Sequence, residues 1–199
     1  MASANQQAMI VDMFSSSTIV PNQMDVQNTP LYDSFNIPAG STLSTPASAL
    51  FTTVGPASGK TYAQTNMQVS RQLPSPEAFA ILGFRLRYSE NISVLDLFNL
   101  LNGFAFEFWM NNKNYQRGPI PFYAGGMGVY GFSTVAATNI FNNGMPGRSE
   151  MHKTAVTLVI ENTMTFYGQL AGNSQVANAA GNGITLYCVL DGLYARGVA

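Results

Sequence analysis

Charged residues are scarce in this chain of 199 residues: nine lysines and arginines and ten aspartates and glutamates make up only 10% of it. An ordinary soluble domain carries roughly 25% charged residues. Because so few charges leave the surface of a monomer poor in solubilising groups, we expect neighbouring molecules to cover part of it. Asn, Gln, Ser and Thr suit such contacts, since they hydrogen-bond without the desolvation cost of ions. The alternative is a secreted or neutral-surface monomer.

Histidine and cysteine are almost absent, with one residue of each, His152 and Cys188. A single cysteine excludes an intramolecular disulfide, and one residue of each type cannot form the usual zinc site. Nucleophilic catalysis would have to use His152 as its base, and no G-x-S-x-G sequence occurs. We therefore expect no catalytic residue, no metal and no cofactor, although a pair of catalytic carboxylates stays open. We interpret His152 as a surface or interface residue and Cys188 as a core or interface thiol.

Positive charge is missing from the first part of the chain, where no lysine or arginine precedes Lys60. Asp12, Asp25 and Asp33 are the only charged side chains there, and the net charge of the whole chain is −1. This excludes a basic N-terminal arm for packaged nucleic acid, and we expect no sequence-specific nucleic-acid binding. The chain also lacks an apolar run of ~18 residues and the basic start of a signal peptide, so we expect neither a membrane span nor a cleaved leader.

Two glycine patterns resemble nucleotide-binding loops. Residues 50–62, LFTTVGPASGKTY, end in Gly-Lys-Thr, but the loop is one residue short and its proline removes an N–H donor. We interpret this segment as strand, turn and strand, with Gly59 at an unusual φ and Lys60 pointing to solvent. Residues 126–131, GMGVYG, follow a proline-containing stretch that cannot be a central strand, so we interpret them as a flexible loop.

Alternation of side chains with a period of two is the main pattern that the sequence does contain. Residues 79–88, FAILGFRLRY, and residues 104–110, FAFEFWM, both show it and are predicted to be strands. The apolar faces that the alternation defines are Leu82, Phe84, Leu86 and Tyr88 in the first strand and Phe104, Phe106, Phe108 and Met110 in the second. Further strands are predicted within 153–162, 164–172 and 182–197.

One segment has helical spacing instead. Residues 93–102 are predicted to form a short helix, with Ser93 as its N-cap and Gly103 at its end. Together with about eight to ten short strands, this predicts an all-β sandwich or barrel. Residues 1–30 show little periodicity and are interpreted as an extended or mobile arm, and residues 31–199 as one domain.

The sole tryptophan, Trp109, lies on the face of its strand opposite the phenylalanines, beside Glu107. We expect Trp109, Tyr115 and His152 to lie at an interface. The competing interpretation is a sugar-stacking platform formed by exposed aromatics such as Trp109 and Tyr115, as in lectin-like modules.

The order of these segments resembles a known family. The polar arm is followed by LYDSFNIPAGSTLS, then by TNMQVSRQLPSPEAFAILGFRLRY, a short helix, FAFEFWMNNKNYQRGPIPF, the glycine-rich YAGGMGVYG and the closing YCVLDGLYARGVA. The chain in this respect resembles the single jelly-roll, upright β-barrel major capsid proteins of tailless icosahedral bacteriophages with an internal membrane. The resemblance implies a jelly-roll β-sandwich with one short helix and an N-terminal arm.

The same resemblance implies a structural function. It predicts a non-enzymatic capsid subunit, made in the host cytoplasm and located in the virion, that assembles with copies of itself and with other capsid proteins. An internal viral membrane is implied as a further partner that the protein contacts. The alternative is a spike or fibre module that recognises host glycans or a receptor, and an enzyme is the third and least favoured class.

Overall fold

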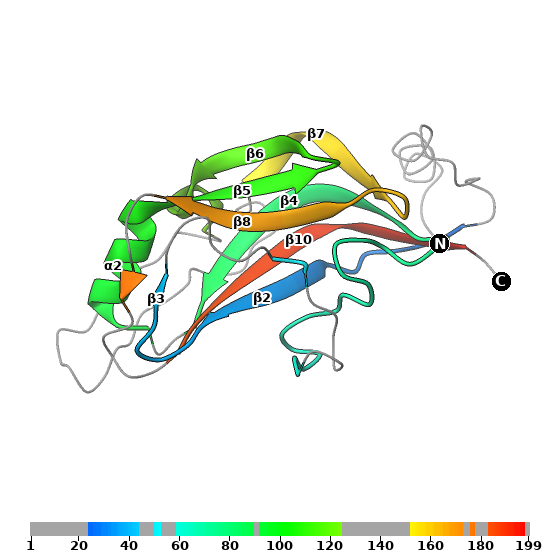
Figure 1. Cartoon of the computed structure of the whole chain (residues 1–199). Helices are drawn as coiled ribbons and strands as arrows, with labels where there is room; N and C mark the ends of the chain where they lie inside the picture. Colours follow the sequence, from blue (N-terminus) through cyan, green and yellow to red (C-terminus); the bar gives the residue numbers. More distant parts are fainter. Residues whose placement is uncertain are drawn as a thin grey trace.

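Two antiparallel sheets pack face to face in the computed structural model of this protein (Figure 1). The structure describes residues 24–43, 50–52, 59–89, 92–124, 152–172, 176–177 and 183–197. Most of these residues lie in strands, and one α-helix lies at the end of the sandwich. The prediction of an all-β fold with one short helix is therefore confirmed.

The larger sheet is built around β10 (Ile184–Gly197). On one side β10 pairs with β4 (Ala78–Tyr88), which in turn pairs with β7 (His152–Glu161). On its other side β10 pairs with two strands in succession: β2 (Leu31–Ile37) along its first half and β1 (Met24–Gln27) at its last residues. β1 and the last residues of β10 thus lie at the same end of the sandwich (Figure 1).

The smaller sheet has β5 (Phe104–Met110) between β6 (Lys113–Pro119) and β8 (Phe166–Gly172). A further pair, β3 (Thr42–Leu43) with β9 (Val176–Ala177), forms a short ladder of its own. The antiparallel pairs β2–β10, β3–β9, β4–β7 and β5–β6 are nested within one another along the chain. Nested pairs of this kind, wrapped around a core as two sheets, are the strand order of a jelly roll.

The core between the sheets is rich in aromatic rings. Phe84 on β4 lies with its ring centroid 5.1 Å from that of Phe108 and 6.1 Å from that of Phe106, both on β5. Tyr123, from the 3₁₀ helix η3 (Ile120–Tyr123), packs 5.1 Å from Phe106. The predicted apolar face of 104–110 is confirmed, since all four of its members are buried: Phe104, Phe106, Phe108 and Met110.

The alternation predicted for β4 holds only in its second half. Phe84 faces the core as predicted, but the fully buried side chain before it is Ile81, whereas Leu82 is only partly buried. The pairing of β4 with both neighbouring strands shifts between Ile81 and Gly83. Leu82 is therefore the extra residue of a β-bulge, which exchanges the two faces of the strand at that point.

The predicted helix is present as α2 (Val94–Gly103). Its N-cap is Ser93, as expected, and the hydroxyl oxygen of Ser93 accepts a hydrogen bond of 3.0 Å from the backbone N–H of Asp96. At its other end α2 leads directly into β5, so that the helix closes one end of the sandwich (Figure 1).

Apolar side chains lie on both the buried and the exposed side of α2. Leu97 and Leu100 are buried against the sandwich, while Val94, Leu95 and Phe98 are exposed, Phe98 by 64%. A helix that is apolar on its outward side as well presents a surface suited to contact with another molecule.

Candidate functional site

The outward face of the smaller sheet carries a group of polar and aromatic side chains. Side chains alternate along a strand, so Glu107 and Trp109 point away from the core that their neighbours Phe106 and Phe108 occupy. Their cross-strand neighbours are Arg117 on β6 and Gln169 and Tyr167 on β8. Three adjacent strands therefore bring this group together.

Glu107 lies on this outward face and is nevertheless only 1% exposed. Its carboxylate oxygen Oε1 accepts a 2.5 Å hydrogen bond from Nε of Arg117, whose Nη2 also forms an ion pair with it. The other oxygen, Oε2, accepts hydrogen bonds from Nε2 of Gln169 at 2.7 Å and from Nε1 of Trp109 at 3.0 Å. The carboxylate is thus covered by the three side chains that it binds.

This surrounding determines the charge state of Glu107. Burial by itself raises the pKa of the carboxyl group. The hydrogen bonds from Gln169, Trp109 and Arg117, together with the positive charge of Arg117, outweigh burial and hold the pKa below its ordinary value. Glu107 is therefore ionised at neutral pH and fixes the orientation of the indole and guanidinium groups around it.

Replacing Glu107 with glutamine tests this network. At pH 7 we expect Glu107→Gln to lower the free energy of unfolding by about 2 kcal/mol, because it removes charge-assisted hydrogen bonds. Because the pKa of Glu107 is lower in the folded state than in the unfolded state, the ionised carboxylate stabilises the folded protein at pH values above the unfolded pKa, near 4.5. This stabilisation is lost as the pH falls below that value and through the folded pKa. The difference between wild type and variant should therefore shrink below about pH 4.5 in urea unfolding curves.

The matched control is Glu161→Gln, at the end of β7 on the other sheet. A Glu107→Gln effect that stays the same from pH 7 to pH 3.5, or that equals the effect at Glu161, would contradict the role assigned to the ionised carboxylate.

Next to this network, Trp109 and Tyr167 form a parallel aromatic pair. Their ring centroids lie 6.1 Å apart, and their planes differ by only 4°. The guanidinium group of Arg71 lies over the Tyr167 ring, 5.2 Å from its centroid, within the range of a cation–π contact. We call Trp109, Tyr167 and Arg71 the outer aromatic cluster.

Arg71 is held in place by its backbone. Its φ is 61°, in the left-handed region that residues other than glycine seldom adopt. The N–H of Arg71 donates to the carbonyl of Phe51 at 2.7 Å, and its carbonyl accepts from the N–H of Phe166 at 2.9 Å. These two bonds tie the loop before β4 to Phe51 and to the start of β8, and the exposed guanidinium lies beside Tyr167.

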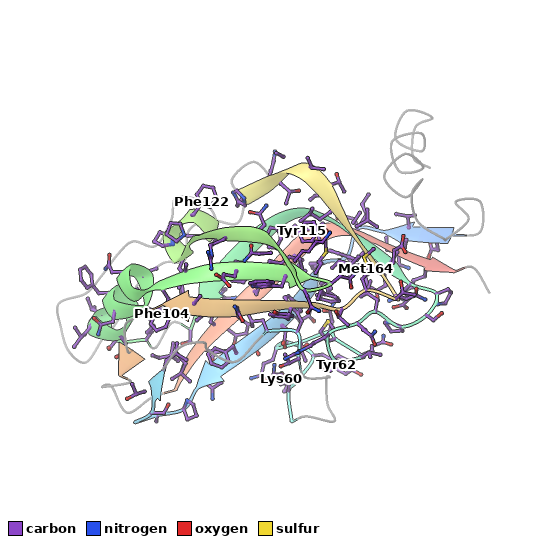
Figure 2. All side chains as sticks on the ribbon, turned by 45° about the horizontal axis from the view of Figure 1, so that its top comes forward. Lys60, Tyr62, Phe104, Tyr115, Phe122 and Met164 are labelled. Atoms are coloured by element: carbon purple, nitrogen blue, oxygen red, sulfur yellow. The ribbon has the colours of Figure 1, made fainter. Side chains whose placement is uncertain are left out.

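Two of the predicted interface residues lie near each other. Trp109 is part of the outer aromatic cluster, and Tyr115 lies on the neighbouring strand β6. Phe108 pairs with Gln116 and Trp109 pairs with Asn114, so Tyr115 has no partner residue on β5. Tyr115 is thus the extra residue of a bulge on an edge strand, and its side chain is 43% exposed (Figure 2).

The third predicted residue, His152, lies elsewhere. It begins β7 in the larger sheet, with its ring 4.3 Å from that of Phe122 and 5.2 Å from that of Tyr123. Partial burial lowers the pKa of His152, which favours the neutral imidazole. His152 thus belongs to the larger sheet, whereas Trp109 and Tyr115 belong to the smaller sheet.

The prediction that Lys60 points to solvent is wrong. Its Nζ forms an ion pair with Oδ1 of Asp33 at 2.7 Å and donates to the carbonyl of Ser34 at 2.6 Å. Asp33, on β2, is 1% exposed and also accepts a hydrogen bond of 2.8 Å from the N–H of Phe51. A buried carboxylate needs a counter-charge, and Lys60 supplies it. The expected unusual φ of Gly59 is confirmed, at 83°.

The strands predicted on either side of Lys60 are absent from the described residues there. Leu50 makes only an isolated bridge, to Gly168, and residues 61–64 form a turn in which the N–H of Gln64 donates to the carbonyl of Thr61. The loop instead connects to the rest of the fold through side chains and single backbone bonds. Residues 53–58 and the second glycine pattern, 126–131, lie outside the described residues.

Cys188 is fully buried in β10 with a free thiol, which confirms its placement in the core. Burial raises the pKa of the thiol well above its ordinary value, and the nearby charge of Asp33 adds to this, so the reactive thiolate is disfavoured. In the ranges described, no three His, Cys, Asp or Glu residues gather as metal ligands would. No helix in those ranges has the length and apolar character needed to cross a membrane.

Several residues of the outward face were not predicted from the sequence. Tyr167 and Gln169 could have been placed on one face by the alternation within residues 166–172, since Phe166 and Leu170 occupy the other. Arg117 and Arg71 give no such signal, because their positions depend on strand pairing and on a loop.

No family model, curated protein or solved structure matches this chain. The outward face of the smaller sheet and the exposed side of α2 are thus the candidate functional surfaces on their geometry alone.

Proposed function

We propose that this protein is a structural subunit of a virus particle, a capsid protein that assembles with copies of itself into an icosahedral shell. The observation that carries the proposal is a jelly-roll strand order combined with large apolar side chains on a surface of low charge. The family resemblance of the sequence supports the same conclusion. In this role the protein acts through packing in the virion, with other capsid proteins and an internal membrane as further partners.

The exposed apolar residues support self-association. Val94, Leu95 and Phe98 lie on α2 at one end of the sandwich, and Phe122 and Val156 are exposed by 56% and 73%. Apolar surface of this kind is stabilised when a partner excludes water from it, at about 25 cal/mol for each Å² buried. With charged residues at only 10%, little electrostatic repulsion opposes contact between copies.

The predicted arm, residues 1–30, includes β1, which pairs with β10, so the main test of assembly uses the part of the arm that precedes β1. We expect deletion of residues 1–23 to prevent the formation of closed particles while the domain stays folded, because β1 and its pairing with β10 are retained. Purified wild-type protein should form particles visible by electron microscopy, and the shortened protein should form small oligomers of unchanged thermal unfolding temperature. Deletion of residues 1–30 is the comparison, because it also removes β1 and should lower that temperature.

Light scattering after size-exclusion chromatography distinguishes a capsid subunit from a spike or fibre module. A wild-type protein that stays monomeric, or that forms one small discrete oligomer at every concentration and salt condition, would contradict a shell subunit.

A second candidate function is a spike or fibre module that binds host glycans. The specific observation that favours it is the parallel pair of Trp109 and Tyr167 on an outward sheet face, since sugar rings stack against such aromatic surfaces.

A further inference from the structure

We propose that the outward face of β5 and β8 binds an acidic oligosaccharide, with a sugar ring against Trp109 and a carboxylate or sulfate group paired with Arg71, which lies over the ring of Tyr167. The inference deepens the glycan-binding candidate and rests on it, but it does not depend on shell assembly.

The aromatic surface is organised before any ligand binds. Nε1 of Trp109 is fixed by its hydrogen bond to Glu107, and the Tyr167 ring is held parallel to the indole and beneath Arg71. Side chains that are already ordered lose little conformational entropy on binding, so more of the contact energy appears as affinity. The centroids of the two parallel rings lie 6.1 Å apart on adjacent strands, and the pair offers an apolar contact surface for a pyranose ring.

The charges on this face select an acidic ligand. The only carboxylate on the outward side of β5, that of Glu107, is buried under the side chains that it binds. Arg71 and Arg117 are both exposed, and Arg71 has an aromatic ring rather than a carboxylate as its neighbour. A guanidinium group in this setting is suited to bidentate pairing with a carboxylate or sulfate.

Polar amides complete the surface. Gln169 on β8 lies opposite Glu107, and Asn114 on β6 lies opposite Trp109. Amide groups both donate and accept hydrogen bonds, as sugar hydroxyls require. Nucleic acid is less well matched, because its binding depends on neutralising many phosphates, and the chain has a net charge of −1.

The sole tryptophan makes the site directly observable. Because Trp109 is the only tryptophan in the chain, a ligand that stacks on it should change the intrinsic fluorescence of the full-length protein. We expect a saturable change on titration with a heparin-derived tetrasaccharide, which carries sulfate and carboxylate groups, or with tri-galacturonic acid, which carries carboxylates alone. Maltotriose, as the neutral probe, should bind at least tenfold more weakly.

Two arginine variants provide the decisive comparison. Arg71→Gln should weaken binding of the acidic sugar at least tenfold in isothermal titration calorimetry. Arg87→Gln is the matched control, because Arg87 lies over Tyr187 on the outward face of the other sheet, 5.8 Å from the ring centroid, and should leave the affinity unchanged. Thermal unfolding of both variants shows whether a variant that binds more weakly is still folded.

Each alternative result has a distinct meaning. Equal affinity for maltotriose and the acidic sugars would overturn the inference and leave the glycan-binding candidate standing. Absence of binding by any sugar, with particles still forming, would overturn both and leave the capsid proposal intact. Equal losses in Arg71→Gln and Arg87→Gln, or tighter binding of a single-stranded oligonucleotide than of any acidic sugar, would also overturn the inference.

Discussion

Replacing Lys60 with methionine is expected to lower the free energy of unfolding by about 3 kcal/mol, because it leaves the carboxylate of Asp33 buried without its counter-charge. Methionine keeps much of the aliphatic length of lysine but cannot pair with Asp33 or donate to the carbonyl of Ser34. Lys60 is 22% exposed and Asp33 only 1%, so water can compensate for little of the loss. Urea unfolding followed by circular dichroism measures the effect.

A double variant separates the charge from the rest of the contact. In Asp33→Asn with Lys60→Met, the asparagine oxygen can still accept the hydrogen bond from the N–H of Phe51, and no charge is left buried. We expect this double variant to recover most of the stability that Lys60→Met loses. Lys113→Met, at an exposed lysine that begins β6, should change the free energy of unfolding by less than about 0.5 kcal/mol.

The role of Lys60 as a counter-charge would be contradicted by two results. One is a Lys60→Met variant as stable as the Lys113→Met control. The other is a double variant that is less stable than Lys60→Met alone.

Replacing Gly192 with alanine is expected to destabilise the protein by about 3 kcal/mol or more, through overpacking between two paired strands. A Cβ atom at this position would lie 2.0 Å from the carbonyl oxygen of Ala80 and 2.8 Å from the ring of Phe79. Because Ala80 belongs to β4, which pairs on both sides, its backbone cannot move away without breaking a ladder. The measurement is the urea midpoint of unfolding, with the yield of soluble protein as a second measure.

Gly183→Ala is the matched control. A Cβ atom there would first meet the side-chain oxygen of Asn36 at 3.1 Å, and Asn36 is exposed and able to rotate. We expect this change to cost less than about 1 kcal/mol. If Gly192→Ala were no more harmful than Gly183→Ala, the close approach of β10 to β4 at this point would not be a constraint on the sequence.

The sequence predicted correctly those elements that depend on local patterns. Alternation in 104–110 identified the strand and its buried face, because a strand between a core and an outward surface requires a period of two. Ser93 identified the start of α2, because the N-cap is formed with a residue only three positions away. The same local reasoning failed at Leu82, where a bulge in strand pairing reversed the faces of β4.

The candidate site was predicted only in part. Trp109 was singled out because it is the sole tryptophan and lies opposite the phenylalanines of its strand. Trp109 and Tyr115 lie on adjacent strands of the smaller sheet, whereas His152 belongs to the larger sheet. The burial of Glu107 could not be foreseen, since Arg117 and Gln169 reach it from two different strands.

The sequence by itself determined that this protein is an all-β sandwich with one helix and very few charges, because alternation, capping and composition are properties of short segments or of the whole chain. Only the tertiary structure decided what the charges do. Lys60 and Asp33 are 27 residues apart and meet because a loop folds back onto β2. Glu107 becomes a buried anion because three strands converge on it. Such pairings depend on which segments become neighbours, and a buried charge is tolerated only where the fold brings its partners to it.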